Sequence, residues 1–250
     1  MIEIENIWKS FGENNVLRGV SLEISDGETH AIIGKSGCGK SVLLKIIVAL
    51  LKPDEGEIFI DGENIFAADE KRLYEIRKKF GFLFQSAALF DSLTVAENIA
   101  LPLTESEEKK FSAAEISRLV SEKLEMVGLE KTENLKPSEL SGGMQKRVGL
   151  ARALITNPKY ILYDEPTTGL DPIMSDSIDA LIKSLNEQLN VTSIIVTHDM
   201  FSVENVAERI SMIHEGEIYF TGSLSEILST DDEVIKNFIK RTGFVSQKIL

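Results

Sequence analysis

Cysteine is almost absent from this chain, which has a single one, Cys38, among 250 residues. No disulfide can form within the chain, as is usual for proteins of a reducing compartment. Long apolar runs are also missing, because the most apolar stretch, residues 42–51, contains Lys45 and is shorter than the roughly 18 residues of a membrane span. Residues 1–6 offer neither a basic nor an apolar segment, so we expect no secretory signal. We therefore predict a cytoplasmic location, with any membrane-spanning helices supplied by another chain.

Positive charge is scarce as well. The 27 lysines and arginines are outnumbered by 40 aspartates and glutamates, which gives a formal net charge of -13. Non-specific binding to nucleic acid and unaided binding to anionic lipid both depend on lysine and arginine. We therefore expect no nucleic-acid partner and no independent attachment to a lipid surface.

Apolar patterns typical of strands and of helices alternate along the chain, which favours an α/β core with a mostly parallel sheet. Between residues 87 and 154 the patterns are helical, which indicates an inserted helical subdomain. A short helical tail is expected after residue 222. Strands are predicted near residues 2–4, 20–24, 30–33, 58–60, 80–84, 160–163 and 193–196, and helices near residues 40–50, 116–127, 144–155 and 178–189.

A glycine-rich segment between a predicted strand and a predicted helix matches G-x-x-x-x-G-K-[ST]. Glycines permit turns that leave backbone N–H groups and a helix N-terminus facing phosphates. We expect Lys40 to reach the β- and γ-phosphates and the Ser41 hydroxyl to bind Mg²⁺. Cys38 is interpreted as a small filler, because no partner base is visible. The predicted nucleotide-binding residues here are Gly34, Lys35, Ser36, Gly37, Cys38, Gly39, Lys40, Ser41 and Val42.

Two acids, Asp164 and Glu165, follow the predicted strand at residues 160–163. Strand carboxyl ends line the ligand crevice of a parallel sheet. We expect Asp164 to hold Mg²⁺, directly or through water, and Glu165 to polarise the attacking water as general base. Alone, the pair would be interpreted as solvated acids at a strand end, but beside a phosphate loop it indicates a hydrolytic site.

The segment Leu140-Ser141-Gly142-Gly143, taken with these two motifs, resembles the signature of the ATP-binding cassette family. Other residues follow in the family's order. Gln85 resembles the Q-loop glutamine, His198 the switch histidine and Phe11 the aromatic residue placed against adenine. Thr168-Gly169-Leu170-Asp171 resembles the D-loop. The resemblance extends from about residue 2 to residue 222, nearly the whole chain.

The resemblance implies one ABC ATPase domain over residues 1–250, with ATP and Mg²⁺ as cofactors. Residues 1–86 and 156–222 would form a P-loop NTPase core with an N-terminal antiparallel β-subdomain. Residues 87–155 would form the helical signature subdomain, and residues 223–250 a helical tail.

The resemblance also implies a composite active site between two copies of the chain. The helix N-terminus at Ser141, Gly142 and Gly143 is an anion site, which would contact the γ-phosphate held by the second copy. Asp171 would line the same nucleotide. Gln85 would couple Mg²⁺ and the attacking water to the helical subdomain, and His198 would contact the γ-phosphate.

Many members of the family carry glutamine at the position of Met144. With residues 84–90 and 97–103, the segment 140–144 resembles ATPases of Mla/Mce-type lipid transporters. This implies phospholipid transport, an integral-membrane permease at the inner face of the cell membrane and an Mce-type lipid-binding subunit. Two alternatives stay open: an importer or exporter of another substrate, and a non-transport cassette of the iron–sulfur assembly or cell-division type.

Overall fold

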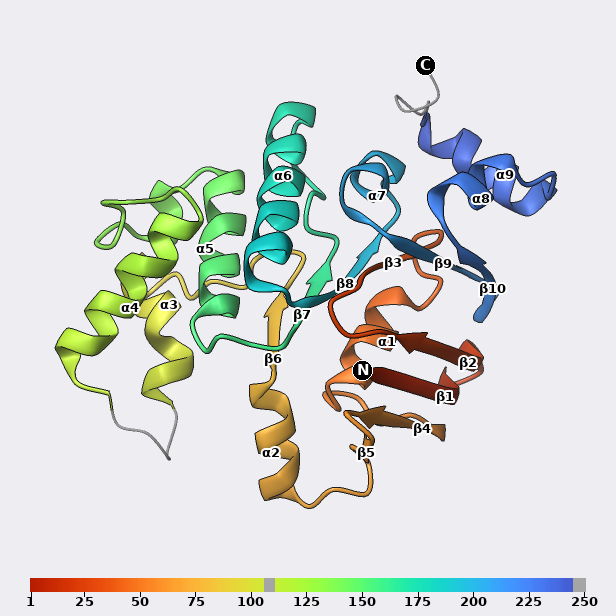
Figure 1. The fold of residues 1–250 in the computed structure, drawn as a ribbon, viewed down its shortest axis with the longest axis horizontal. Coiled ribbons are helices and arrows are strands. Elements are labelled where there is room, and N and C mark those ends of the chain that lie inside the picture. Colours follow the sequence, from red (N-terminus) through yellow and green to blue (C-terminus); the bar gives the residue numbers. More distant parts are fainter. Residues whose placement is uncertain (106–110, 245–250) are drawn as a thin grey trace.

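The computed structural model describes residues 1–105 and 111–244, and its centre is a six-stranded sheet (Figure 1). The strand order is β10-β9-β3-β8-β7-β6, and every neighbouring pair is parallel except β9 with β10. The mostly parallel core predicted from the sequence is therefore confirmed. The strands are β3 (Thr29–Ile33), β6 (Phe80–Leu83), β7 (Tyr160–Asp164), β8 (Thr192–Thr197), β9 (Arg209–His214) and β10 (Glu217–Gly222).

A second sheet, from the N-terminal part of the chain, is antiparallel and has the order β2-β1-β4-β5. Apolar side chains alternate along its two long strands. Ile2, Ile4, Val20, Leu22 and Ile24 are all buried, because one face of the sheet packs on the core while the other faces outward. Its strands are β1 (Ile2–Phe11), β2 (Asn14–Ile24), β4 (Glu55–Ile60) and β5 (Glu63–Asn64).

The helix α1 (Lys40–Ile47) packs on β7 and β8 and shares one apolar cluster with the antiparallel sheet. It therefore holds the two sheets together directly behind the glycine-rich loop. The helix ends before the predicted Leu50. Val48 caps it, and Ala49 has a left-handed φ of +53°, which breaks the helical conformation.

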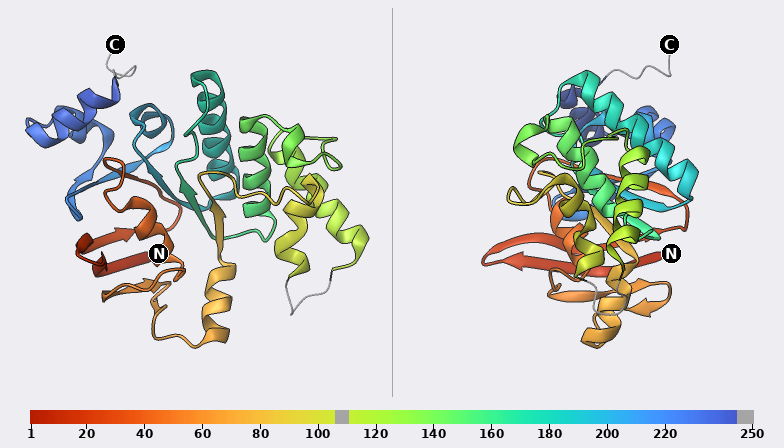
Figure 2. Two further views of the ribbon diagram at one scale, coloured as in Figure 1. Left: turned by 180° about the vertical axis from the view of Figure 1, so that it is seen from behind. Right: turned by 90° about the vertical axis from the view of Figure 1, so that its left-hand side faces the viewer.

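Helix α2 lies against β6 and shares the apolar cluster of α1, whereas the remaining helices lie on the opposite face of the core sheet or beyond its β6 edge (Figures 1 and 2). Those from α3 to α5 form the helical part at this edge, in agreement with the predicted insertion. Among the described residues no helix is long and apolar enough to cross a membrane. The helices are α2 (Glu70–Lys78), α3 (Val95–Thr104), α4 (Ala113–Met126), the 3-10 turn η1 (Pro137–Glu139), α5 (Gly142–Leu154), α6 (Pro172–Leu189), α7 (Met200–Val206), α8 (Leu224–Ser229) and α9 (Glu233–Thr242).

Helix α5 joins the helical part to the core sheet, because it contacts α3, α4, α6 and β6. It is buried on several sides, and its buried residues include Lys146, Val148, Gly149 and Ala151. Close packing against β6 needs a glycine, since a Cβ added to Gly149 would lie 2.9 Å from a Leu83 methyl.

The tail forms the helices α8 and α9, as predicted. Phe238 and Phe244 are buried in a cluster with Ile33, Met200 and Met212, so these aromatic side chains cover the chain's own surface. The predicted tail and helical subdomain also include residues 245–250 and 106–110, which lie outside the described residues.

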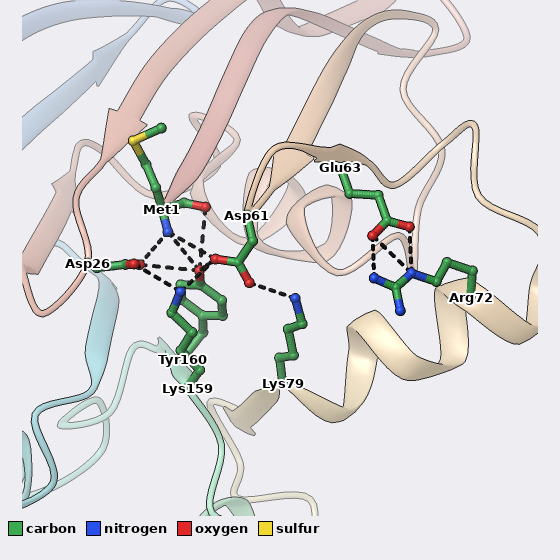
Figure 3. Close-up of polar contacts among 8 residues, drawn as sticks. All are labelled: Met1, Asp26, Asp61, Glu63, Arg72, Lys79, Lys159 and Tyr160. Carbon is green, nitrogen blue, oxygen red and sulfur yellow. Dashed lines mark hydrogen bonds and ion pairs between the residues drawn. The ribbon is translucent and has the colours of Figure 1, made fainter.

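A polar network fastens the antiparallel sheet to the amino end of β7 (Figure 3). The Asp61 carboxylate accepts hydrogen bonds from Lys79 and Lys159, both at 2.6 Å, and from the Tyr160 hydroxyl. Lys159 Nζ also donates to Asp26 at 2.9 Å. Burial alone would raise the pKa of Asp61, but these hydrogen bonds hold it well below its usual value. The acids Asp164 and Glu165 lie at the opposite, carboxyl end of β7.

Candidate active site

The carboxyl ends of four adjacent parallel strands carry the predicted site residues. Strand β3 leads into the loop 34–41, β8 leads to His198, β7 ends at Asp164 beside Glu165, and β6 leads to Gln85. Because the carboxyl ends of parallel strands meet at the same edge of a sheet, the fold brings these segments together.

Three glycines of the glycine-rich loop, Gly34, Gly37 and Gly39, have left-handed φ values, and two of them also lie too close to a neighbour for a Cβ. Gly34 has a φ of +154°, and a Cβ there would lie 2.5 Å from the carbonyl oxygen of Ile213. Gly39 has a φ of +105°, and its Cβ would lie 2.7 Å from a Leu17 methyl. Cys38 packs on the apolar cluster beneath the loop, and burial raises the pKa of its thiol. A half-buried thiol with a raised pKa agrees with its interpretation as a filler.

Lys40 and Ser41 connect this loop to the two acids. The Lys40 ammonium donates to two carbonyl groups of the loop, at 2.9 and 3.2 Å, and lies 3.5 Å from Glu165 Oε1. The Ser41 hydroxyl donates to Asp164 Oδ1 at 2.7 Å. Lys40 and Asp164 are both buried. A cation, a hydroxyl and two carboxylates therefore converge at the start of α1.

Glu165 is the most highly connected side chain of the site. Its Oε2 lies 2.9 Å from His198 Nδ1 and accepts hydrogen bonds from Thr168 at 3.1 Å and Thr197 at 3.4 Å. Its backbone has a left-handed φ of +49°, and its N–H donates to the Val196 carbonyl at 2.9 Å. Positive φ is uncommon outside glycine and clusters at functional sites, so the turn is held in a costly conformation that aims this carboxylate.

Comparison with known proteins identifies the family. The ABC transporter family pattern matches residues 17–168, more than half of the chain. The chain belongs to the ABC transporter family. It is 43% identical over 238 residues to the probable ribonucleotide transport ATP-binding protein mkl of Mycobacterium leprae, covering 95% of this chain and 68% of that protein.

Two further relatives extend the comparison. The chain is 40% identical over 240 residues to MlaF of Haemophilus influenzae, an intermembrane phospholipid transport system ATP-binding protein, covering 96% of this chain and 90% of that protein. A solved dimeric ATP-binding cassette, in a post-hydrolysis state with ADP and Pi, has a TM-score of 0.82 and 40% identity, covering 90% of this chain and 99% of that one. This chain is thus an ABC ATPase, and the predicted fold class is confirmed.

In this ABC ATPase the signature segment forms the N-terminus of α5. The Ser141 hydroxyl caps the helix by accepting from the Met144 N–H at 3.3 Å. Ser141 and Gly142 are exposed. Gly143 is buried, and a Cβ there would lie 2.0 Å from the Met174 methyl. The positive end of the α5 dipole is therefore exposed to solvent at Ser141 and Gly142, as an anion site requires.

Asp171 of the predicted D-loop caps α6, since its Oδ1 accepts from the Met174 N–H at 3.0 Å. Next to it Ile173 is 80% exposed, the most exposed of the large apolar side chains among the described residues. The D-loop and the signature thus form one exposed surface containing Ile173 and Ser141.

Phe11 and Gln85 lie at the periphery of the site. Phe11 is half exposed at the end of β1, with Lys9 Nζ 5.6 Å from its ring centre. Gln85 is exposed just after β6. His198 contacts Glu165, and Val42 packs against the apolar cluster under α1. The roles of these residues toward a nucleotide stay predictions.

The sequence patterns do not predict the burial of two charged residues, Lys146 and Asp179. Lys146 lies on α5, where a lysine is ordinarily expected to be solvated, yet it is 5% exposed. Asp179 lies on α6, is 2% exposed, and has one carboxylate oxygen without a hydrogen-bond partner. Only the three-dimensional packing reveals them.

The segment after β6 that contains Gln85, residues 84–90, is called the Gln85 loop. A groove of about 600 Å³ lies beside this loop, between α2, β6, α3 and α5. Its lining is mainly apolar and aromatic, with three basic side chains and the acidic Glu105. Phe90, one of its residues, is 53% exposed. The lining residues include Phe80, Phe82, Phe84, Phe90, Leu101, Pro102, Arg77, Lys78 and Arg152.

Replacing Asp179 by asparagine is expected to stabilise the fold at neutral pH. Burial raises the pKa of Asp179 to about 6, above its unfolded value of 3.8. As the pH rises through this interval, the unfolded chain releases the proton first, so the folded state loses stability. A pKa separation of about two corresponds to a gain of up to about 3 kcal/mol in Asp179→Asn above pH 6.

Urea unfolding at pH 4 and at pH 7.5 measures this effect. At pH 4 the gain should largely vanish, because the carboxyl is then mostly protonated in the folded state and about half protonated in the unfolded state. Asp176→Asn, on an exposed position of the same helix, should change the unfolding free energy by less than about 0.5 kcal/mol at both pH values. A gain of equal size at both pH values would contradict the linkage.

Proposed function

We propose that this ABC ATPase hydrolyses Mg-ATP as half of a homodimer and energises phospholipid transport through a partner permease. The observation that carries the lipid assignment is the similarity to the phospholipid ATPase of Haemophilus influenzae, which extends over nearly the whole of both chains. The segments 84–90, 97–103 and 140–144, which border the groove or the signature, support the same assignment.

The phosphate loop and Lys40 would bind the ATP phosphates. The loop glycines leave no side chain between the backbone N–H groups and an approaching phosphate. Lys40, which now donates to loop carbonyls, would turn its ammonium to the β- and γ-phosphates. Phe11 would stack on adenine from the end of β1.

Ser41 and Asp164 fit a magnesium ion. They supply a hydroxyl and a carboxylate oxygen 2.7 Å apart, and Mg²⁺ is commonly held by one or two carboxylates together with substrate phosphates. Gln85 would add a ligand from its loop. Among the described residues no cluster of three acids, histidines or cysteines forms a complete metal site, in keeping with an ion that arrives with its nucleotide. The bound ion would neutralise charge on the phosphates.

Glu165 would take the proton of the attacking water. Thr168 and His198 hold its carboxylate in place through the contacts to Oε2. On ATP binding, His198 would turn from Glu165 to the γ-phosphate. The signature helix of the second copy would complete the site from the other side, so that one chain alone leaves the γ-phosphate uncovered.

The groove beside the Gln85 loop would receive the permease. Its aromatic lining suits an apolar segment, and its excess of basic side chains, three against the one acidic Glu105, favours an acidic residue on that segment. Because the groove lies between the helical part and the core, movement of one relative to the other would alter its shape. ATP binding and transport would thereby be coupled. A lipid would be handled by the permease and an Mce-type lipid-binding subunit.

Purification of the tagged full chain from detergent-solubilised host membranes tests this proposal. Mass spectrometry is expected to find a multi-span permease together with an Mce-type subunit. Phe90→Glu, in the exposed part of the groove, should lose both partners and keep the basal ATPase rate. Leu189→Glu, exposed on α6 outside the groove, should retain them. Absence of both partners from the wild-type sample would contradict the lipid assignment.

The mycobacterial relative named for ribonucleotide transport favours a second candidate function, the transport of a nucleotide through a permease. Deletion of the gene separates the two. Loss of lipid asymmetry in the cell envelope supports lipid transport, and normal lipid distribution with loss of nucleotide uptake supports the second candidate.

A further inference from the structure

One buried cation near the site has no role in the mechanism above. Lys146 projects from α5, and its ammonium donates to the backbone carbonyl of Gln85 at 2.5 Å and to that of Glu165 at 3.2 Å. Among the described residues no carboxylate forms an ion pair with it at 4 Å or less. Burial lowers its pKa, which measures the cost of holding a charge there. A cost of this kind is retained where the group has a task.

The same face of α5 contacts the Gln85 loop at two more residues. Gly149, three residues on, lets the helix approach Leu83 and Ala87 closely. Arg152, three residues further, donates to the carbonyls of Ala87 and Ala88 at 2.6 and 2.7 Å. Residues three apart on a helix share a face. One stripe of α5 is therefore complementary to the backbone of this loop.

The loop needs this support because its conformation is unusual. Ala87 and Ala88 are consecutive non-glycine residues with left-handed φ values of +58° and +46°. Glu165, the second acceptor of Lys146, is also left-handed. Such conformations persist only where surrounding contacts fix them. Lys146 is the one residue of this stripe whose side chain contacts both the Gln85 loop and the turn of the predicted base.

We propose that Lys146 is a positioning residue, which locks the signature helix, the Gln85 loop and the Glu165 turn into one unit. The inference rests on the proposed role of Glu165 as general base. When the Gln85 loop moves at the permease groove, the Lys146 ammonium would move with it. Because the same ammonium donates to the Glu165 carbonyl, the Glu165 turn would move too. The two ends of the coupling, permease docking and water activation, are then joined by a direct hydrogen-bonded path.

Steady-state ATP hydrolysis by the full chain tests the proposal. Lys146→Met keeps the apolar stem and removes the donors, so Glu165 loses its fixed position while the phosphate loop is untouched. We expect kcat to fall about 10- to 100-fold, with KM for ATP changed less than about twofold. Lys146→Arg, which keeps charge and donors, should recover most of the rate.

Lys123→Met is the matched control. Lys123 is likewise buried and has a pKa lowered by burial, but it donates to Asn157, in the segment between α5 and β7, and to neither the Gln85 loop nor the Glu165 turn. Its loss should lower the melting temperature without lowering kcat. A fall in kcat equal to that of Lys146→Met would show a merely structural role for both lysines and overturn the proposal.

A double-variant comparison separates this proposal from the general mechanism. If Lys146 acts through Glu165, Lys146→Met should not lower the residual rate of Glu165→Gln any further. An equal fold loss in both backgrounds would overturn the positioning role. If Glu165→Gln itself were fully active, the proposed base would be wrong instead. Should the methionine variant not fold, Lys146→Gln, which keeps an amide donor, is measured in the same way.

Discussion

Glu165→Gln is expected to lower the ATP turnover number about 10²- to 10⁴-fold, the usual contribution of a general base. Glutamine matches the shape of glutamate and keeps a carbonyl oxygen for Thr168 and His198, but it cannot accept the proton of water. Steady-state release of phosphate at saturating Mg-ATP measures the effect. ATP binding should be retained, because the substitution leaves the phosphate loop and Lys40 unchanged.

Glu215→Gln is a close control for this experiment. Glu215 has a left-handed φ of +50°, nearly that of Glu165, but its side chain is 78% exposed and lies next to His214. It should hydrolyse ATP at the wild-type rate. Wild-type turnover by Glu165→Gln would show that another group activates the water.

Ser141→Asp is expected to lower ATP turnover about 1,000-fold, whereas Ser141→Asn should retain most of it. Aspartate and asparagine cap helices about as well as serine, so both variants keep α5 intact. They differ in charge alone. Two like charges about 4 Å apart at an effective dielectric of 20 repel by about 4 kcal/mol, which corresponds to about 10³-fold in rate. A phosphate carried by the second copy would meet this repulsion.

Nucleotide affinity of the separate chains distinguishes the composite site from a local defect. In the proposed arrangement Ser141 contacts the nucleotide of the other copy, so the monomer of Ser141→Asp should bind ATP as tightly as wild type. A loss of ATP binding by the monomer, or equal turnover of the two variants, would contradict a signature that acts across the dimer.

The core sheet and the site segments were predictable from sequence because they combine two strong signals. Buried parallel strands are nearly continuous apolar runs, as at residues 160–163, and the chemical motifs follow their ends. The patterns do not predict α2, β9 or β10. In α2 only Ile76 is buried, so it has no apolar stripe. β10 alternates between half-buried and exposed residues, so it lacks the continuous apolar run of a strand buried on both faces.

Within the site, sequence patterns predict which residues gather but not what each contacts. The Glu165 contact with His198 depends on the register of β7 and β8. The burial of Lys146 depends on loops 61 and 19 residues away along the chain. A lysine in an amphipathic pattern is ordinarily placed on the solvated face, and no local signal marks the exception.

The mass of Glu165→Gln in solution with and without Mg-ATP tests the composite site most directly. With Mg-ATP the variant should elute as a dimer, at twice the 27.7 kDa of the chain, because ATP joins the two copies and is not cleaved. With ADP it should remain a monomer, and adding Ser141→Asp to it should restore the monomer in ATP. A monomer under all of these conditions, from protein that binds ATP, would contradict the nucleotide-bridged dimer.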